Sequence, residues 1–97
     1  MTKTKNPRTI IKRQYLVSRR AELGISQYRV CQLTKFDIPT YSQIENGKSG
    51  LRMNAYILIK LADALEMPVE ELVQLEADYF SMFCKINDMI PQYMVEE

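Results

Sequence analysis

The segment from Gly24 to Gly47 limits the fold of this chain more than any other, because it fits two short helices joined by a tight turn. Ser26 can cap the first helix and Asp37 the second, since a short side-chain oxygen accepts hydrogen bonds from the unpaired backbone donors of a first turn. Residues 33–36 leave room only for the turn between them. Gly47 follows the second helix and accepts the left-handed conformation that a helix end often needs.

Each predicted helix, one over about 26–34 and the other over about 37–46, has one apolar stripe. Apolar residues recur after three or four positions, and this spacing turns one side of each helix inward. The inward residues are Val30 and Cys31 on the first helix and Tyr41 and Ile44 on the second. The second helix keeps a polar outer face, so the segment predicts a helix-turn-helix.

Three motifs in this order resemble the XRE family of helix-turn-helix proteins, which includes the lambda-type and Cro-type phage repressors. They are LGISQ at 23–27, IENGK at 44–48 and LADALEMPVEEL at 61–72, and no gap separates Gln27 from Glu45. The resemblance covers roughly residues 16–73. It implies an all-α fold, a compact five-helix lambda-repressor-like domain, and it implies sequence-specific binding of double-stranded DNA.

The resemblance makes the helix at 37–46 the recognition helix, whose outward face would enter the major groove. Gln43 can pair with adenine, because its amide supplies both a donor and an acceptor. Ile38 and Pro39 are unusual at base-reading positions, since they offer only apolar contact. They either touch thymine methyl groups or belong to a protein contact. The candidate base-contacting residues are Ile38, Pro39, Thr40, Ser42 and Gln43.

Other residues are candidates for the DNA backbone or for holding the recognition helix. By the resemblance, Arg20 and Glu45 form a largely buried ion pair, and Gln27 contacts a phosphate and braces a side chain of the recognition helix. The candidate phosphate-contacting residues are Gln27, Tyr28, Arg29, Asn46, Lys48 and Arg52. Lys35 stands where many members of the family have glycine.

The net charge of +1 conceals a strong asymmetry along the chain. Residues 1–60 hold 12 Lys or Arg and 3 Asp or Glu, which gives 12 − 3 = +9, whereas residues 61–97 hold 1 and 9, which gives 1 − 9 = −8. A basic half that contains the helix-turn-helix suits a polyanion, whose phosphates attract cations and release counterions. The alternative is that the charges only solvate the two ends of the domain.

Composition argues against other classes of protein. The chain has no histidine and shows neither a catalytic constellation nor a phosphate-binding glycine loop, so we expect no enzyme, no cofactor and no metal site. Cys31 and Cys84 lie in apolar stretches, and we expect them to be buried and reduced. No long apolar run and no apolar leader occur, so we expect no membrane segment and a cytoplasmic location.

The remaining chain divides into an arm over 1–9, a DNA-binding domain over 10–74 and a C-terminal helix over 75–97. The arm is basic and is expected to be flexible or to lie along a DNA groove. The first helix is predicted from about Ile10, with Arg20 on its inner face and with Lys12, Arg13 and Arg19 pointing elsewhere. A fourth helix over about 55–65 should place Leu58, Leu61, Ala62 and Leu65 in the core, and Pro68 should begin a fifth.

The C-terminal helix carries an apolar stripe that must pack somewhere. One alternative is that it folds back over the fourth helix, and the other is that it forms a dimer interface; the two are compatible. Pro91 should end the helix near Ile90. The candidate dimerisation residues are Leu75, Tyr79, Met82, Phe83, Ile86, Met89 and Ile90.

Together these features predict a transcriptional regulator, in the commonest case a repressor, that binds a pseudo-palindromic operator as a homodimer. The alternative is a protein-interaction module on a helix-turn-helix scaffold, such as an antitoxin or a phage or plasmid factor that captures a protein partner. The apolar pair Ile38 and Pro39 favours this alternative, and the +9 charge on the half that would face DNA opposes it.

Overall fold

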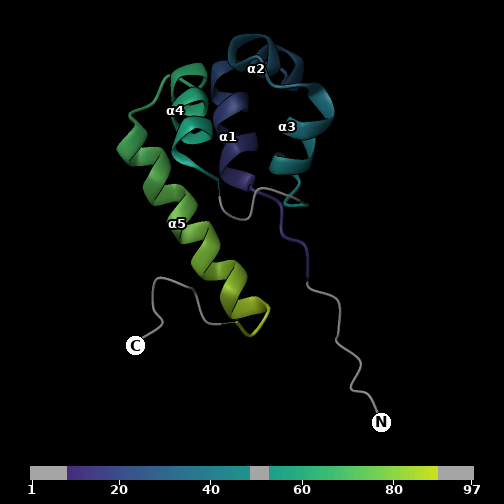
Figure 1. Cartoon of the computed structure of the whole chain (residues 1–97), viewed down its shortest axis with the longest axis vertical. Coiled ribbons are helices and arrows are strands. Elements are labelled where there is room, and N and C mark those ends of the chain that lie inside the picture. Colours follow the sequence, from purple (N-terminus) through teal and green to yellow (C-terminus); the bar gives the residue numbers. More distant parts are fainter. Residues whose placement is uncertain (1–8, 49–52, 90–97) are drawn as a thin grey trace.

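The computed structural model describes residues 9–48 and 53–89, and this part of the chain contains helices and no strand (Figure 1). The all-α prediction is therefore confirmed. The helices are α1 (Gln14–Leu23), α2 (Gln27–Thr34), α3 (Ile38–Glu45), α4 (Ala55–Ala64) and α5 (Val69–Ile86). Over the described residues, none of them is long and apolar enough to cross a bilayer.

The core lies where α1 to α4 meet the first turns of α5. It contains the predicted inward stripes of α2 and α3 together with the predicted residues of α4, except that Leu58 is only half-buried at its edge. Both cysteines are buried and free, as expected. The buried apolar residues of this cluster are Leu16, Val30, Cys31, Tyr41, Ile44, Leu61, Ala62, Ala64, Leu65 and Leu72.

Each of the described helices is followed by a residue with positive φ, which closes the helix by a left-handed turn. Gly24 and Gly47 adopt this conformation without a Cβ penalty, whereas a non-glycine residue pays about 1–2 kcal/mol. Lys35, at φ 71°, is a non-glycine residue with this backbone strain. Glu66, at φ 54°, follows α4, and the side chain of Arg19 donates to the carbonyls of Leu65 and Glu66, at 2.8 Å each. This contact offsets part of the cost at the end of α4.

The first helix begins at Gln14, so the predicted helix over residues 10–13 is wrong. Tertiary hydrogen bonds take the backbone groups of this segment instead. The carbonyl of Ile11 accepts from the Tyr79 hydroxyl at 2.8 Å, and the amide of Arg13 donates to the carbonyl of Glu45 at 2.8 Å. Residues 9–13 therefore run in non-helical form between the end of α3 and α5.

The fifth and C-terminal helices form one continuous helix, α5, whose second half extends past the four-helix body (Figure 1). It ends at Ile86 rather than near Ile90, because Asp88 turns left-handed and the amides of Asp88 and Met89 bond back into the last turn. Asn87 also bonds to both backbone groups of Thr9. Tyr79 of the stripe bonds to Ile11, so the described part of the stripe packs partly on residues 9–13.

Three predictions fall on residues that the structure does not describe. They concern the arm over 1–8, the loop that holds Arg52, and the end of the C-terminal stripe at Ile90.

Gly47 should be the less replaceable of two left-handed glycines. A Cβ at Gly47 would lie 1.9 Å from the carbonyl oxygen of Ile11, whereas a Cβ at Gly24 would meet nothing within 4 Å. Gly24→Ala should therefore cost about 1–2 kcal/mol of unfolding free energy, from backbone strain alone. Gly47→Ala should cost clearly more, because residues 9–13 must also move. Chemical denaturation of both variants measures the difference, and equal losses would contradict the close approach.

Candidate nucleic-acid interface

Helix α3, which the sequence predicts to be the recognition helix, presents two distinct faces. Tyr41, Ile44 and Glu45 are buried against the rest of the domain, with exposed fractions of 0%, 3% and 2%. The five candidate base-contacting residues lie on the other side: Ile38, Pro39, Thr40 and Gln43 are exposed and Ser42 is half-buried. The outward face of α3 is thus accessible to a groove of DNA while its inner face is held by the core.

The first turn of α3 differs in one detail from the prediction. Asp37 occupies the N-cap position with extended backbone, but its side chain makes no capping hydrogen bond. Pro39 lies in that first turn and has no amide to satisfy, which reduces the number of unpaired donors. Ser26, in contrast, caps α2 as predicted by accepting from the amide of Arg29 at 3.1 Å.

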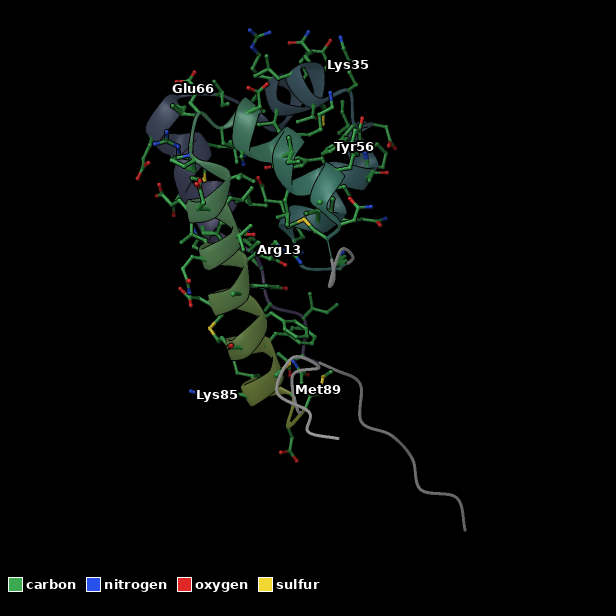
Figure 2. The ribbon with its side chains drawn as sticks, turned by 60° about the vertical axis from the view of Figure 1, so that its left-hand side comes forward. Arg13, Lys35, Tyr56, Glu66, Lys85 and Met89 are labelled. Carbon is green, nitrogen blue, oxygen red and sulfur yellow. The ribbon has the colours of Figure 1, made fainter. Side chains whose placement is uncertain are left out.

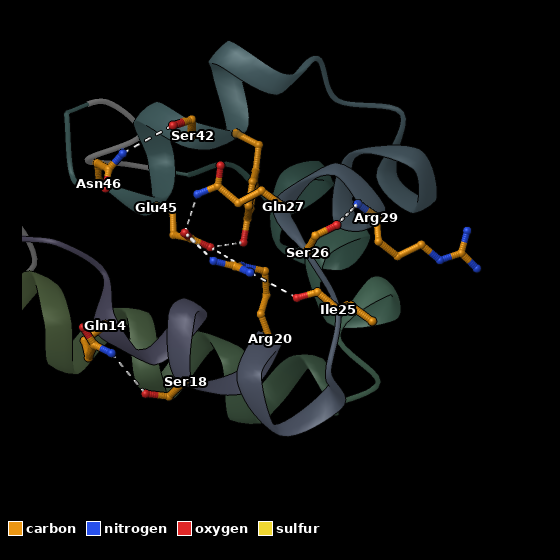
Figure 3. A network of polar contacts seen from close by, with 11 residues as sticks. Gln14, Ser18, Arg20, Ile25, Ser26, Gln27, Arg29, Ser42, Glu45 and Asn46 are labelled. Atoms are coloured by element: carbon orange, nitrogen blue, oxygen red, sulfur yellow. Dashed lines mark hydrogen bonds and ion pairs between the residues drawn. The ribbon is translucent and has the colours of Figure 1, made fainter.

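A buried carboxylate holds α3 in place from its inner face (Figure 3). Arg20 of α1 donates to both oxygens of Glu45, at 2.7 Å and 3.0 Å, so the two residues form the pair that the resemblance implied. Gln27 of α2 donates to Oε1 at 2.5 Å, and Tyr41 donates to Oε2 at 2.8 Å. Three helices therefore meet at one carboxylate.

The electrostatics of this network follow from the number of donors. Burial by itself would raise the pKa of Glu45, but hydrogen bonds from Arg20, Gln27 and Tyr41 outweigh it and leave that pKa below its usual value. Burial, together with the negative charge of Glu45, raises the pKa of Tyr41. Glu45 thus stays ionised and Tyr41 stays protonated, which is the combination that lets the hydroxyl donate.

The candidate phosphate-contacting residues fall into two groups. Tyr28, Arg29 and Lys48 are exposed, and Figure 3 shows Arg29 pointing away from the Glu45 network. Gln27 and Asn46 are half-buried and hold internal contacts, Gln27 with Glu45 and Asn46 with the Ser42 hydroxyl at 3.3 Å. The exposed residues are free to move toward a phosphate, whereas the other two mainly fix their neighbours.

The comparison of the chain with known families agrees with this geometry. The sequence profile of the Cro/C1-type helix-turn-helix DNA-binding domain matches residues 16–78. The chain belongs to this family. No curated protein and no solved structure shows significant similarity to it. Membership supports a DNA-binding regulator, and the matched residues include both α2 and α3.

Part of the basic charge of this Cro/C1-type domain is used internally. Arg13 and Arg20 pair with carboxylates, and Arg19 caps the end of α4. The charge of +9 over residues 1–60 already subtracts Glu45, but not Glu76, the partner of Arg13, so it overstates the charge available to DNA. Among the described residues of the domain, exposed cations on or beside the helix-turn-helix include Arg29, Lys35 and Lys48.

Arg13 is the residue that sequence reasoning placed wrongly. It was expected to point away from the inner face, but its side chain is 0% exposed and lies between α5 and the rest of the domain (Figure 2). It pairs with Glu76 at 2.7 Å and lies over the Tyr79 ring, 4.4 Å from the ring centroid. A helical periodicity cannot find it, because Arg13 precedes the first turn of α1.

The predicted dimerisation residues do not form one exposed stripe. Tyr79 and Phe83 are buried, Leu75 and Met89 are half-buried, and Met82 and Ile86 are 43% and 53% exposed. Tyr79 contacts residues 9–13, as described above. In the described ranges, 9–48 and 53–89, no group of His, Cys, Asp and Glu is arranged to hold a metal ion.

Acid should remove the stabilisation that comes from Glu45. Its pKa is lowered by folding, so this contribution is complete above the unfolded value of about 4.3 and is lost as the pH falls through the lower, folded value. Glu45→Gln should lower the free energy of unfolding at neutral pH. The difference in this free energy between the variant and the wild type should decrease below about pH 4. Urea denaturation across this range measures both curves.

The matched control is Glu22→Gln, which removes an exposed carboxylate, also paired with an arginine of α1. Its difference from the wild type should be small at neutral pH, because exposed pairs contribute little. If the difference in unfolding free energy between Glu45→Gln and the wild type stays constant down to acid pH, folding does not stabilise the charge of Glu45.

Proposed function

We propose that the protein is a transcriptional regulator, in the simplest case a repressor, that binds a pseudo-palindromic DNA operator as a homodimer. The observation that supports this best is the two-sided recognition helix: its inner face is fixed by the Glu45 network, and its five candidate base-contacting residues face outward. A rigidly held helix can discriminate base edges, because misplaced donors and acceptors lose their pairing energy.

In this proposal, two successive parts of the chain have different roles. The body over residues 10–74 contacts DNA, with base readout by the face of α3 and phosphate contacts from Tyr28, Arg29 and Lys48. The region over 75–97 joins two copies. In such a dimer the two recognition helices would lie about 34 Å apart, one helical turn of DNA.

Met82 supports the dimer, because it lines an apolar hollow between α5 and the start of α1. This hollow has a volume of about 240 Å³, and Lys12 and Asp78 lie at its edge. A two-fold axis brings the same patch of each copy together, so a lysine of one copy can face an aspartate of the other. The exposed side chains of Met82 and Ile86 would then leave water.

The experiment for the proposed function is selection of binding sites from random duplex DNA with the full-length protein. The expected result is a two-fold symmetric site with half-sites one helical turn apart. Weak, salt-sensitive binding without an enriched sequence would contradict it. That outcome would favour the second candidate, capture of a protein partner, for which the 45% exposed side chain of Ile38 is the supporting observation.

Gln43 and Lys48 should affect DNA binding in different ways. Gln43→Ala should cost about 1–3 kcal/mol on the selected site and relax one base position per half-site. Lys48→Ala should weaken all sequences alike and flatten the salt dependence of binding by about one unit of slope. Titration of selected and scrambled duplexes at several salt concentrations separates the two effects. An unchanged base preference for Gln43→Ala would remove this residue from the readout.

A charge at Met82 should dissociate the dimer. Met82→Glu would place an unpaired carboxylate in the apolar contact and should raise the dissociation constant at least about tenfold. Val73→Glu is the matched control, since Val73 is also exposed, at 46%, but lies nine residues away, half a turn round α5. Sedimentation equilibrium measures both. A dimer that survives Met82→Glu would place the interface elsewhere.

A further inference from the structure

Arg13, which lies outside the helix-turn-helix, bonds to the backbone at the C-terminal end of the recognition helix. Arg13 donates its backbone amide to the carbonyl of Glu45 at 2.8 Å and its Nη1 to the carbonyl of Ile44 at 2.8 Å. These are the last two carbonyls of α3, which a helix leaves without intrahelical partners. A cation at this position also complements the negative end of the helix dipole.

The other side of the same guanidinium is fixed to α5. Its Nε and Nη2 donate to the two oxygens of Glu76, at 2.9 Å and 2.7 Å. Tyr15 donates to Glu76 as well, and the Tyr79 ring lies against the guanidinium. The side chain of Arg13 therefore connects α5 to the end of α3 through contacts that are entirely buried at the arginine.

Two candidate phosphate-contacting residues, Asn46 and Lys48, directly follow the end of α3. The amide of Gly47 bonds to Ile44 and the amide of Lys48 bonds to Gln43, so the backbone of Lys48 is fixed to the last turn. The backbone of Gly47 in turn lies against that of Ile11, in the segment that precedes Arg13. A displacement of the last turn of α3 would therefore move Lys48 and Asn46 with it.

We infer that Arg13 is a positioning residue for DNA binding, which ties α5 to the phosphate-contacting end of the recognition helix. This inference rests on the proposed function. It makes the first half of α5 a part of the DNA-binding unit in addition to any role in dimerisation. Lysine cannot replace this arginine, because the planar guanidinium serves a carboxylate with one edge and a carbonyl with another.

The test compares two charge-neutral double variants. Arg13→Met/Glu76→Met removes the connection and replaces a buried pair by apolar side chains, a change that is often tolerated because the desolvation cost of the charges is also removed. The control, Arg19→Met/Glu22→Met, removes a pair within α1 whose arginine donates to the carbonyls at the end of α4 instead of those of α3. Neither changes the net charge, so long-range attraction to DNA stays the same.

The probe is a mixed-sequence duplex of about 25 base pairs, titrated by fluorescence anisotropy between about 50 and 200 mM salt, where phosphate contacts dominate binding. The folded fraction of each variant is measured by circular dichroism under the same conditions. With the connection removed, affinity should fall roughly fivefold or more at the lower salt. The slope of log affinity against log salt should flatten by about one, because one phosphate contact is lost.

A merely structural role would give a different result. Loss of folded protein lowers the affinity equally at every salt concentration and leaves the slope unchanged. A cycle with Lys48→Ala adds a second criterion: this substitution should no longer change the slope in the Arg13→Met/Glu76→Met background, since residues that act through one another are not additive. An unchanged slope in the folded variant, or a full effect of Lys48→Ala in it, would overturn the inference.

Glu76→Gln is the second variant, to be used if the double variant does not fold. It keeps the size of the side chain and removes the charge that holds Arg13, so it should flatten the slope in the same direction. A wild-type slope for Glu76→Gln would also overturn the inference. Failure of the wild type to bind the duplex at all would instead reject the proposed function, so the two failures are distinguishable.

Discussion

The arrangement of this domain depends on how one residue of α3, Glu45, is bonded. Its carboxylate accepts from Arg20, Gln27 and Tyr41, and its carbonyl accepts from the amide of Arg13. A buried carboxylate is costly unless its lone pairs are satisfied, and its donors come from α1, α2 and α3, whereas the carbonyl is bonded by the segment before α1. These helices can bond to the carboxylate of Glu45 only when they are correctly placed relative to one another. The network therefore fixes the orientation of α3.

Arg13 and Arg20 act on different parts of the same helix. Arg20 holds the inner face of α3 through a side chain, whereas Arg13 holds its C-terminal carbonyls. Both are charged and donor-rich, and both are paired with a carboxylate from another helix. Such pairs add little net stability but disfavour alternative packings, in which a charge would stay buried without a partner. For a protein that reads DNA, the benefit is a fixed geometry of α3.

The apolar residues of α5 are divided between the protein's own packing and the exposed surface. Tyr79 and Phe83 are buried within the chain, so they stabilise the monomer, while Met82 and Ile86 on the neighbouring face of α5 stay exposed. Tyr79 contributes to both the packing of residues 9–13 and the position of Arg13, since its hydroxyl bonds to Ile11 and its ring faces the guanidinium.

Local sequence determined the helices, the turn within 24–47 and the two faces of α3, because each depends on spacing and capping over a few residues. It also indicated the family, through motifs that lie close together. Only the tertiary structure decided the conformation of residues 9–13, the single helix from Val69 to Ile86 and the burial of Arg13. The partner of Arg13 in α5, Glu76, lies 63 positions away, and the carbonyl of Ile44 lies 31 positions away. No helical periodicity contains such contacts, since they exist only after α5 and the end of α3 have both been brought to Arg13.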